Sequence, residues 1–211
     1  MSKIKLKHSS GNSMSIGAPA TNPASDLELK LPATIGTAGQ VLKNSSTAGT
    51  LEFGKEGVAE ADQWRVSSDF TMSTSGAFIT SNWERVDSDN FAKVGTGMTE
   101  SSGCFSFPST GIWKIELFYT TLNTSGTSKY NEARIATTTN NSSYGECMTA
   151  FTCNDTQNFI TNGSGSFIFD VTNTSTHKVK LYNYAWSSNT VWKGDSTTNY
   201  NAMTFIRLGD T

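Results

Sequence analysis

Residues 103–121 read GCFSFPSTGIWKIELFYTT, and they contain two strand-like runs on either side of the turn 108–111. Side chains alternate between the two faces of a strand. In the second run this alternation leaves one face wholly apolar: Trp113, Ile115, Leu117 and Tyr119. The opposite face is mixed: Ile112, Lys114, Glu116 and Phe118. The pattern predicts a strand that has one face in a hydrophobic core.

The chain from Trp64 to its end reads as a series of such strands. The candidate strands are 64–72, 78–86, 91–98, 103–107, 112–121, 130–138, 146–153, 165–171, 177–186 and 202–208. The segments between them are rich in Gly, Ser, Asn and Thr, which favour tight turns. Short strands separated by turn signals predict an all-β sandwich or barrel.

Residues 1–60 differ from the rest of the chain. Short strands are predicted at 3–7 and 14–16, and two further arms at 40–43 and 50–53. A third short strand, in which leucines alternate with charged residues, ends at Pro32. These strands carry too few apolar residues to offset the chain entropy of folding alone. We therefore expect this part to complete its core in an intertwined trimer or on a larger body. The residues expected to make this attachment are Ile4, Leu6, Leu27, Leu29 and Leu31.

A domain boundary is predicted near residue 60. Residues 55–63 are the one stretch with passable helical character, and they are interpreted as a linker. The expected domains are an attachment or stalk segment, 1–60, and a head, 61–211.

Composition excludes several classes of function. Charged residues make up 16% of the chain, against about a quarter in a typical soluble domain. The net charge of -2 argues against binding to nucleic acid by phosphate neutralisation. No apolar run is long enough to span a bilayer, and the start of the chain lacks the apolar stretch of a secretory signal. We expect neither nucleic-acid binding nor membrane insertion.

The central stretch, with Asn90-Phe91 before it, resembles the C1q/TNF-like jelly roll. That family has a Gly-x-Phe-x-x-Pro…Gly-x-Tyr/Trp signature, which Gly103–Trp113 follows, and an aromatic-containing last strand, which Met203–Leu208 would form. The resemblance covers about residues 64–211 and implies a ten-stranded sandwich that assembles into homotrimers. In related trimers, aromatic residues of the inner sheet pack at the threefold axis. Tyr119, Tyr182 and Phe205 are candidates for that role and, equally, for the core of a single chain.

The N-terminal part resembles a module of tailed-bacteriophage fibre and appendage proteins, frequent in marine phages. The module reads apolar-x-Ala-Pro, a Leu-rich strand ending in Leu-Pro, Gly-Gln-Val-Leu and a closing Leu-x-Trp/Phe. Residues 16–20, 27–32, 39–43 and 51–54 follow that order, with Phe53 where Trp is common. The resemblance implies a virion protein assembled in the host cytoplasm and bound to other virion proteins through its N-terminal segment.

Aromatic residues in the predicted loops 139–145 and 186–200 are candidates for contact with a receptor. A flat apolar ring with a polar rim suits a sugar or protein ligand. These candidates are Tyr144, Trp186, Trp192 and Tyr200, and a host cell-surface glycan or protein is the expected partner.

The sequence gives little support for a catalytic or metal site. The two histidines, His8 and His177, have no neighbouring ligand pattern in the sequence. The oxygen-rich segment 87–90 could bind calcium, but it lacks EF-hand spacing and is explained more simply as a turn. No carboxylate pair suited to glycoside hydrolysis stands out. Cys104, Cys147 and Cys153 show no metal spacing and are expected to be buried free thiols.

We therefore expect no enzyme activity and no cofactor or metal. The sequence predicts a trimeric, fibre-like tail or capsid appendage that adsorbs to a host surface through loops of its head. Three alternatives remain open: a structural adaptor or capsid decoration protein without a receptor, a polysaccharide-degrading enzyme, and a bacterial C1q-like secreted binding module.

Overall fold

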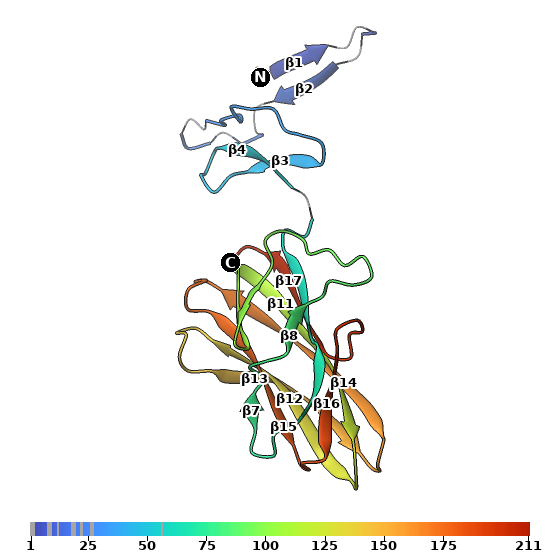
Figure 1. Cartoon of the computed structure of the whole chain (residues 1–211). Helices are drawn as coiled ribbons and strands as arrows, with labels where there is room; N and C mark the ends of the chain where they lie inside the picture. The colour runs from blue at the N-terminus through green and yellow to red at the C-terminus, as the bar shows by residue number, and fades with distance from the viewer. Residues whose placement is uncertain are drawn as a thin grey trace. The chain divides into compact units, whose positions relative to one another are not determined.

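The computed structural model describes residues 3–7, 10–11, 13–17, 20–21, 23–25, 28–55 and 57–211 (Figure 1). These residues form strands and turns, with no helix among them. Accordingly, no helix of the described residues could cross a membrane. The chain divides into two compact units, Met1–Glu56 and Gly57–Thr211.

The first unit consists of two antiparallel hairpins. β1 (Lys3–Lys7) pairs with β2 (Ser13–Gly17), and β3 (Gln40–Asn44) pairs with β4 (Leu51–Lys55). Both hairpins are predicted by the sequence. The strand expected to end at Pro32 is reduced to a single parallel bridge between Lys30 and Thr50. None of the described side chains in this unit is buried.

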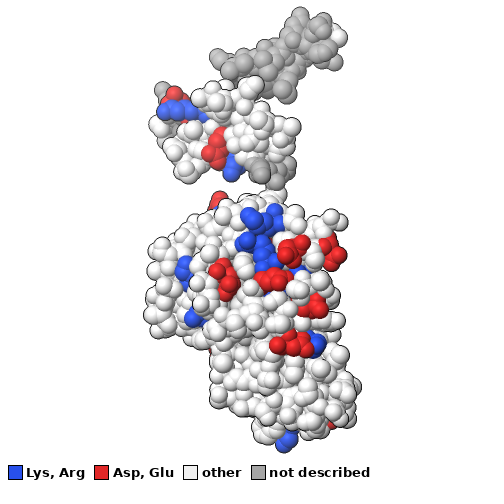
Figure 2. Space-filling view, in the orientation of Figure 1, with Lys and Arg blue, Asp and Glu red and all other residues white. Residues whose placement is uncertain are grey.

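The second unit is a sandwich of two antiparallel sheets. On the face seen in Figure 2, its charged residues gather in the upper part and are sparse below. One sheet has the order β13-β12-β15-β10-β9, with β7 paired to β15. Its strands are β7 (Ala77–Phe78), β9 (Thr99–Ser101), β10 (Cys104–Ser106), β12 (Ser128–Thr138), β13 (Gly145–Asn154) and β15 (Lys178–Ala185).

The other sheet has the order β6-β16-β11-β17-β5-β8, with β14 paired to the free side of β11. Its strands are β5 (Ala61–Val66), β6 (Ser68–Thr71), β8 (Trp83–Arg85), β11 (Gly111–Asn123), β14 (Ile160–Val171), β16 (Thr190–Asp195) and β17 (Ala202–Gly209).

The central sequence stretch links the two sheets. β10 lies in the first sheet and β11 in the second, so the turn at 108–111 carries the chain across the sandwich. The predicted alternation of β11 is confirmed, because its apolar face is buried and its mixed face points outward. Between the sheets, Phe105 of β10 meets Trp64, Trp83 and Phe205 at ring distances of 5.7, 5.0 and 5.3 Å. The stretch thus contributes to the core from both sides.

Several local predictions in the second unit are wrong. The candidate strand 78–86 is divided into β7 and β8, which lie in different sheets, and 64–72 is divided into β5 and β6, which are not neighbours in their sheet. Residues 91–98 form a loop with one bridge at Val94, because Gly95 and Gly97 adopt positive φ angles of 73° and 77°. The helical character of 55–63 is overridden by β5, which pairs with β17. β16 lies in a region that the sequence marks as a loop.

Candidate functional site

The outward face of β15 carries a row of cationic and aromatic side chains. Burial alternates strictly along this strand, so Val179, Leu181, Asn183 and Ala185 point into the sandwich. The outward side chains are Lys178, Lys180, Tyr182 and Tyr184, and Trp186 follows the end of the strand. Neighbouring outward positions on a strand are separated by about 6.6 Å. The row therefore forms an extended strip rather than a pocket.

Neighbouring strands widen this strip with more rings. Tyr130 of β12 stacks on Tyr184 at 5.7 Å and lies 5.5 Å from Trp186. Phe78 of β7 lies 5.6 Å from Tyr182 and 5.7 Å from Tyr144. We call this surface the β15 face and define it by Phe78, Tyr130, Tyr144, Tyr182, Tyr184 and Trp186, with Phe151 at its β13 edge, opposite Glu132.

Cations lie over several of these rings. The Lys129 ammonium is 4.9 Å from the centre of the Trp186 ring, and the Arg134 guanidinium is 5.0 Å from that of Tyr182. Lys180 lies 4.7 Å from the Tyr144 ring and 5.2 Å from Phe78. An aromatic ring attracts a cation through its negatively charged face. The rings therefore hold these flexible side chains in place.

The acids on the same face are already paired. Arg134 donates hydrogen bonds of 2.6 Å to both Glu132 and Glu146. Among the described residues, Lys129 and Lys180 form no ion pair with an acid. These two lysines are thus available to an anionic ligand.

Two phenols of the β15 face are held in the protonated form. Burial, followed by a hydrogen bond with Cys104, raises the pKa of Tyr144, whose hydroxyl is 3.3 Å from the Cys104 sulfur. A hydrogen bond with Tyr184 raises the pKa of Tyr130. The raised pKa keeps each hydroxyl protonated further into the alkaline range.

The four candidate receptor residues separate in the structure. Tyr144 and Trp186 belong to the β15 face, and Tyr200 is exposed elsewhere, 5.9 Å from Lys193. Trp192 is a correction: it is fully buried in β16, stacked between Phe70 and Tyr119, and cannot contact an external ligand. The sequence does not single out Phe78, Tyr130 or Tyr184. The signal that could have found Tyr184 is the period-two run from Lys178 to Trp186.

Two of the three candidates for the trimer interface are also buried in the structure. Tyr119 and Phe205 are fully buried within their own chain. The Tyr119 hydroxyl donates hydrogen bonds to the carbonyls of Asn131 and Ala150 on the opposite sheet. Of the two roles left open by the sequence, core packing is therefore the one these residues have. Tyr182 points outward, but from β15 rather than from the β11 sheet.

A second outward surface covers β14, β11 and β17. Cross-strand registers place its side chains in rows across the three strands. We call it the β11 face and define it by Ile112, Lys114, Glu116, Phe118, Ser164, Ser166, Ile168, Thr204 and Ile206. Phe118 is 41% exposed and Ile168 is 59% exposed. A hollow of about 460 Å³ lies on this face, lined in part by Glu116, Phe118 and Thr204.

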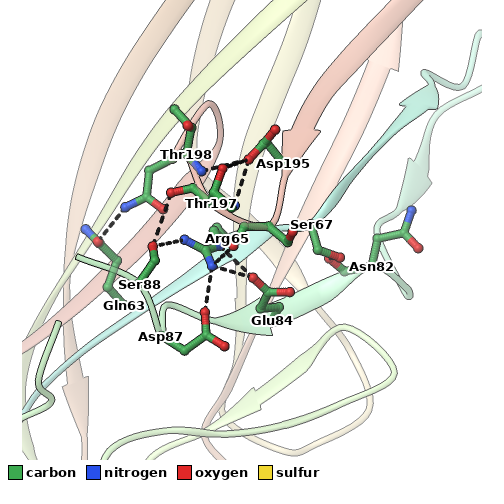
Figure 3. A network of polar contacts seen from close by, with 12 residues as sticks. Gln63, Arg65, Ser67, Asn82, Glu84, Asp87, Ser88, Asp195, Thr197 and Thr198 are labelled. Carbon is green, nitrogen blue, oxygen red and sulfur yellow. Dashed lines mark hydrogen bonds and ion pairs between the residues drawn. The ribbon is translucent and has the colours of Figure 1, made fainter. Parts of the chain in front are cut away.

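The oxygen-rich segment 87–90 is part of a network around Arg65 (Figure 3). Arg65 of β5 is fully buried, and its guanidinium donates to Glu84 at 2.7 Å, Ser88 at 2.9 Å and Asp87 at 2.8 Å. It also donates to the Ser196 carbonyl, which ties the loop after β16 to β5 and β8. Asp87 is thereby engaged by a cation of the protein itself. The network therefore has a structural role: it holds the loop after β16 and residue 87 against β5.

The histidines and possible metal ligands are the remaining candidates for a site. His177 is buried, stacked on Phe169 and placed between the hydroxyls of Thr172 and Thr176, whereas His8 lies outside the described residues. No cluster of three or more His, Cys, Asp or Glu that could hold a metal is found within the described part of the chain.

The cysteines are free, but they are not buried as expected. Cys104 and Cys147 are partly exposed. Cys153 is exposed because its side chain points to the outward face of β13, whereas those of Thr152 and Asn154 point inward.

The attachment candidates are described only in part. Leu29 and Leu31 are exposed, as is Ile35. The backbone of Ile4 and Leu6 lies in β1, but their side chains are outside the described part, and Leu27 lies outside the described residues.

Comparison with known proteins identifies the fold. The sequence matches no protein-family model, and a search of curated proteins finds no relative. Murine APRIL at pH 5.0 is similar in structure, with a TM-score of 0.51 and 7% identity over 71% of this chain and 98% of that chain. The Eiger TNF of S. frugiperda is also similar, with a TM-score of 0.52 and 8% identity over 72% of this chain and 93% of that chain.

The PRD1 vertex protein P5 matches 83% of this chain and 85% of its own, at 15% identity, but its TM-score of 0.48 is too low to support a conclusion. At these identities the likeness to APRIL and Eiger shows the fold alone. The chain is all-β, and its second unit is a TNF-like jelly roll, as the sequence predicts.

Proposed function

We propose that this chain is a virion structural protein, a homotrimeric fibre-like appendage that adsorbs to the host surface through its jelly-roll head. The β15 face is the observation that carries this proposal. Aromatic and cationic side chains cover one outward sheet face, and Trp186 is 48% exposed there. Exposed aromatic surface of this kind marks sites of interaction. The contact surface is thus a sheet face rather than the loop tips alone.

The β11 face is the proposed contact between copies. It exposes apolar side chains, including Phe118 and Ile168, around a hollow. The jelly-roll family that the sequence resembles assembles as homotrimers, which supports this assignment. A trimer would cover the β11 face and present three copies of the β15 face.

The first unit is the proposed attachment segment. Its described side chains are not buried, and Leu29, Leu31 and Ile35 are exposed. Because a segment without a core gains little from folding alone, docking on another virion protein or intertwining with other copies would stabilise it. The resemblance to phage appendage modules favours this role.

The protein acts by binding rather than catalysis in this proposal. Glu132 and Glu146, the acids on the strands beside β15, are both engaged by Arg134. Adsorption would rely on avidity, because linked copies of a weak site bind far more firmly than one copy.

The test is adsorption of the fluorescently labelled full chain to a panel of bacterial strains. We expect saturable binding to some strains, reduced by Trp186→Ala and unaffected by Tyr200→Ala, an exposed aromatic outside the β15 face. Sedimentation should give three times the chain mass of 22.8 kDa. A chain that binds no strain but captures another virion protein would be a structural adaptor. Release of sugars from a surface polysaccharide would instead identify an enzyme.

A further inference from the structure

The arrangement of cations on the β15 face indicates which kind of ligand it takes. Neutral sugars stack on uncovered aromatic rings, but here Lys129 lies over Trp186 and Lys180 lies over Tyr144. To stack on either of these two rings, a neutral sugar would have to displace the ammonium group above it. An anionic group can bind them where they are, and the rings beneath reduce the side-chain entropy lost on binding.

The charge balance of this face points the same way. Its basic side chains are Lys129, Lys178, Lys180 and Arg134, and its paired acids are Glu132 and Glu146. The face therefore carries an excess of positive charge, although the whole chain has a net charge of -2. Such a local excess favours a ligand of negative charge.

The spacing of the cations argues for a polymer. Lys180 and Trp186, the ring beneath Lys129, are six positions apart along the β15 direction, which corresponds to about 20 Å. A monosaccharide cannot reach both ends of such a strip. A chain with repeated acidic groups can, and it can also lay its apolar sugar faces on rings between the lysines, such as Tyr184.

We propose that the β15 face binds an extended acidic polysaccharide, with anionic groups on Lys129 and Lys180 and the sugar chain along β15. This inference rests on the proposed host-binding role and names the class of its ligand. Tyr130 and Tyr144 contribute neutral hydroxyl groups at the margins of the strip.

Matched polymers test the charge requirement. Dextran, carboxymethyl dextran and dextran sulfate of equal length share one backbone and differ in charge, so their binding to the immobilised full chain can be compared directly. We expect at least tenfold tighter binding of a charged polymer than of dextran, weakening as salt is added. Comparing carboxymethyl dextran with dextran sulfate shows whether the face prefers carboxylate or sulfate groups. Equal binding of all three polymers would overturn the proposal.

Matched variants test the site. The double variant Lys129→Gln/Lys180→Gln should weaken binding of the preferred polymer about tenfold, since hydrogen bonds between charged groups are lost. Its control is Lys93→Gln/Lys193→Gln, which removes the same charge elsewhere, and should change affinity less than twofold. Lys93 bonds to carbonyls of its own loop, and Lys193 pairs with Asp69. Equal losses in both double variants would mean non-specific ion exchange and would overturn the site.

Adsorption to cells separates this inference from the proposed function. If the Lys129→Gln/Lys180→Gln chain still adsorbs as well as the original, the acidic-polysaccharide ligand is wrong while host binding stands. If adsorption survives periodate oxidation of cell-surface sugars but is lost after protease treatment, the ligand is a protein and the inference is likewise overturned. If the charged polymers bind the β15 face but no strain is bound, the ligand class holds and the host-binding role fails.

Discussion

The two outward faces of the jelly roll differ in kind. The β15 face carries large rings held under lysine and arginine side chains. The β11 face carries mainly isoleucine, serine and threonine, with Phe118 and the Lys114–Glu116 ion pair, around a hollow. Rings beneath cations suit a charged, solvated ligand. Aliphatic and small hydroxyl side chains suit close packing against another protein surface. One sandwich can therefore assemble through one sheet and recognise a ligand through the other.

A substitution in the shared core should damage both faces together. Phe105 is fully buried among Trp64, Trp83 and Phe205. Phe105→Ala should lower the free energy of unfolding by about 3–5 kcal/mol, because it removes a buried ring and leaves a cavity. Urea denaturation followed by tryptophan fluorescence measures this. A loss below about 1 kcal/mol would contradict the inter-sheet role assigned to this ring.

A charge on the β11 face should affect assembly alone. Phe118→Glu would place a carboxylate at the proposed contact between copies, where burying an unpaired charge is strongly unfavourable. We expect the sedimenting mass to fall to that of one 22.8 kDa chain with the jelly roll still folded. Trp186→Glu is the matched control on the β15 face and should leave the trimer intact. A Phe118→Glu chain that remains trimeric would show that the β11 face is not the interface.

Alkaline pH should lower the free energy of unfolding through Tyr119, which is buried between the two sheets. Burial raises the pKa of Tyr119 to about 12, from an ordinary value of 10.0. The unfolded chain therefore releases this proton first, so the stabilisation is complete below pH 10 and is lost as pH rises to 12. A shift of this size corresponds to about 2–3 kcal/mol. Urea denaturation at several pH values checks it, and Tyr119→Phe should remove this part of the pH dependence. A Tyr119→Phe chain with an unchanged slope above pH 10 would exclude Tyr119 as the source.

Removing the half-exposed ring of Trp186 from the β15 face should have the smallest effect on stability. Trp186 is 48% exposed, and its ring contacts Tyr130 and the Lys129 ammonium. Trp186→Ala should change the free energy of unfolding by less than about 1 kcal/mol, as for most surface substitutions. Ligand binding and cell adsorption should nevertheless fall. Destabilisation of several kcal/mol would instead assign this ring to the fold.

The sequence predicts most of the fold, because alternation along long strands reports directly which side is buried. β11, β12, β13 and β15 follow this pattern, and the hairpins of the first unit follow theirs. β16 is missed because Thr190–Asp195 is short and lies among Asn, Ser and Gly residues that favour turns. Trp192 is misplaced as a loop residue for the same reason.

The site is predicted less well than the fold. Tyr144 and Trp186 are found from their loop positions, but their partner rings, Phe78 of β7 and Tyr130 of β12, are distant in sequence. Which strands become neighbours is set by the sheet order, and period-two alternation alone does not reveal that order. Alternation also cannot separate a core tyrosine such as Tyr119 from an interface tyrosine, because both are apolar positions on one side of a strand.

The strict alternation of β15 has an evolutionary consequence. Inward residues of this strand pack in the jelly roll, while outward residues of the same strand form the proposed ligand surface. Substitutions at Tyr182, Tyr184 or Lys180 can therefore alter recognition at little cost to folding, since surface changes are usually worth within about 0.5 kcal/mol. A one-residue insertion would exchange the two sets and destroy both properties. Point substitutions on the outward side of β15 can thus change recognition, whereas insertions or deletions within the strand would disrupt the fold.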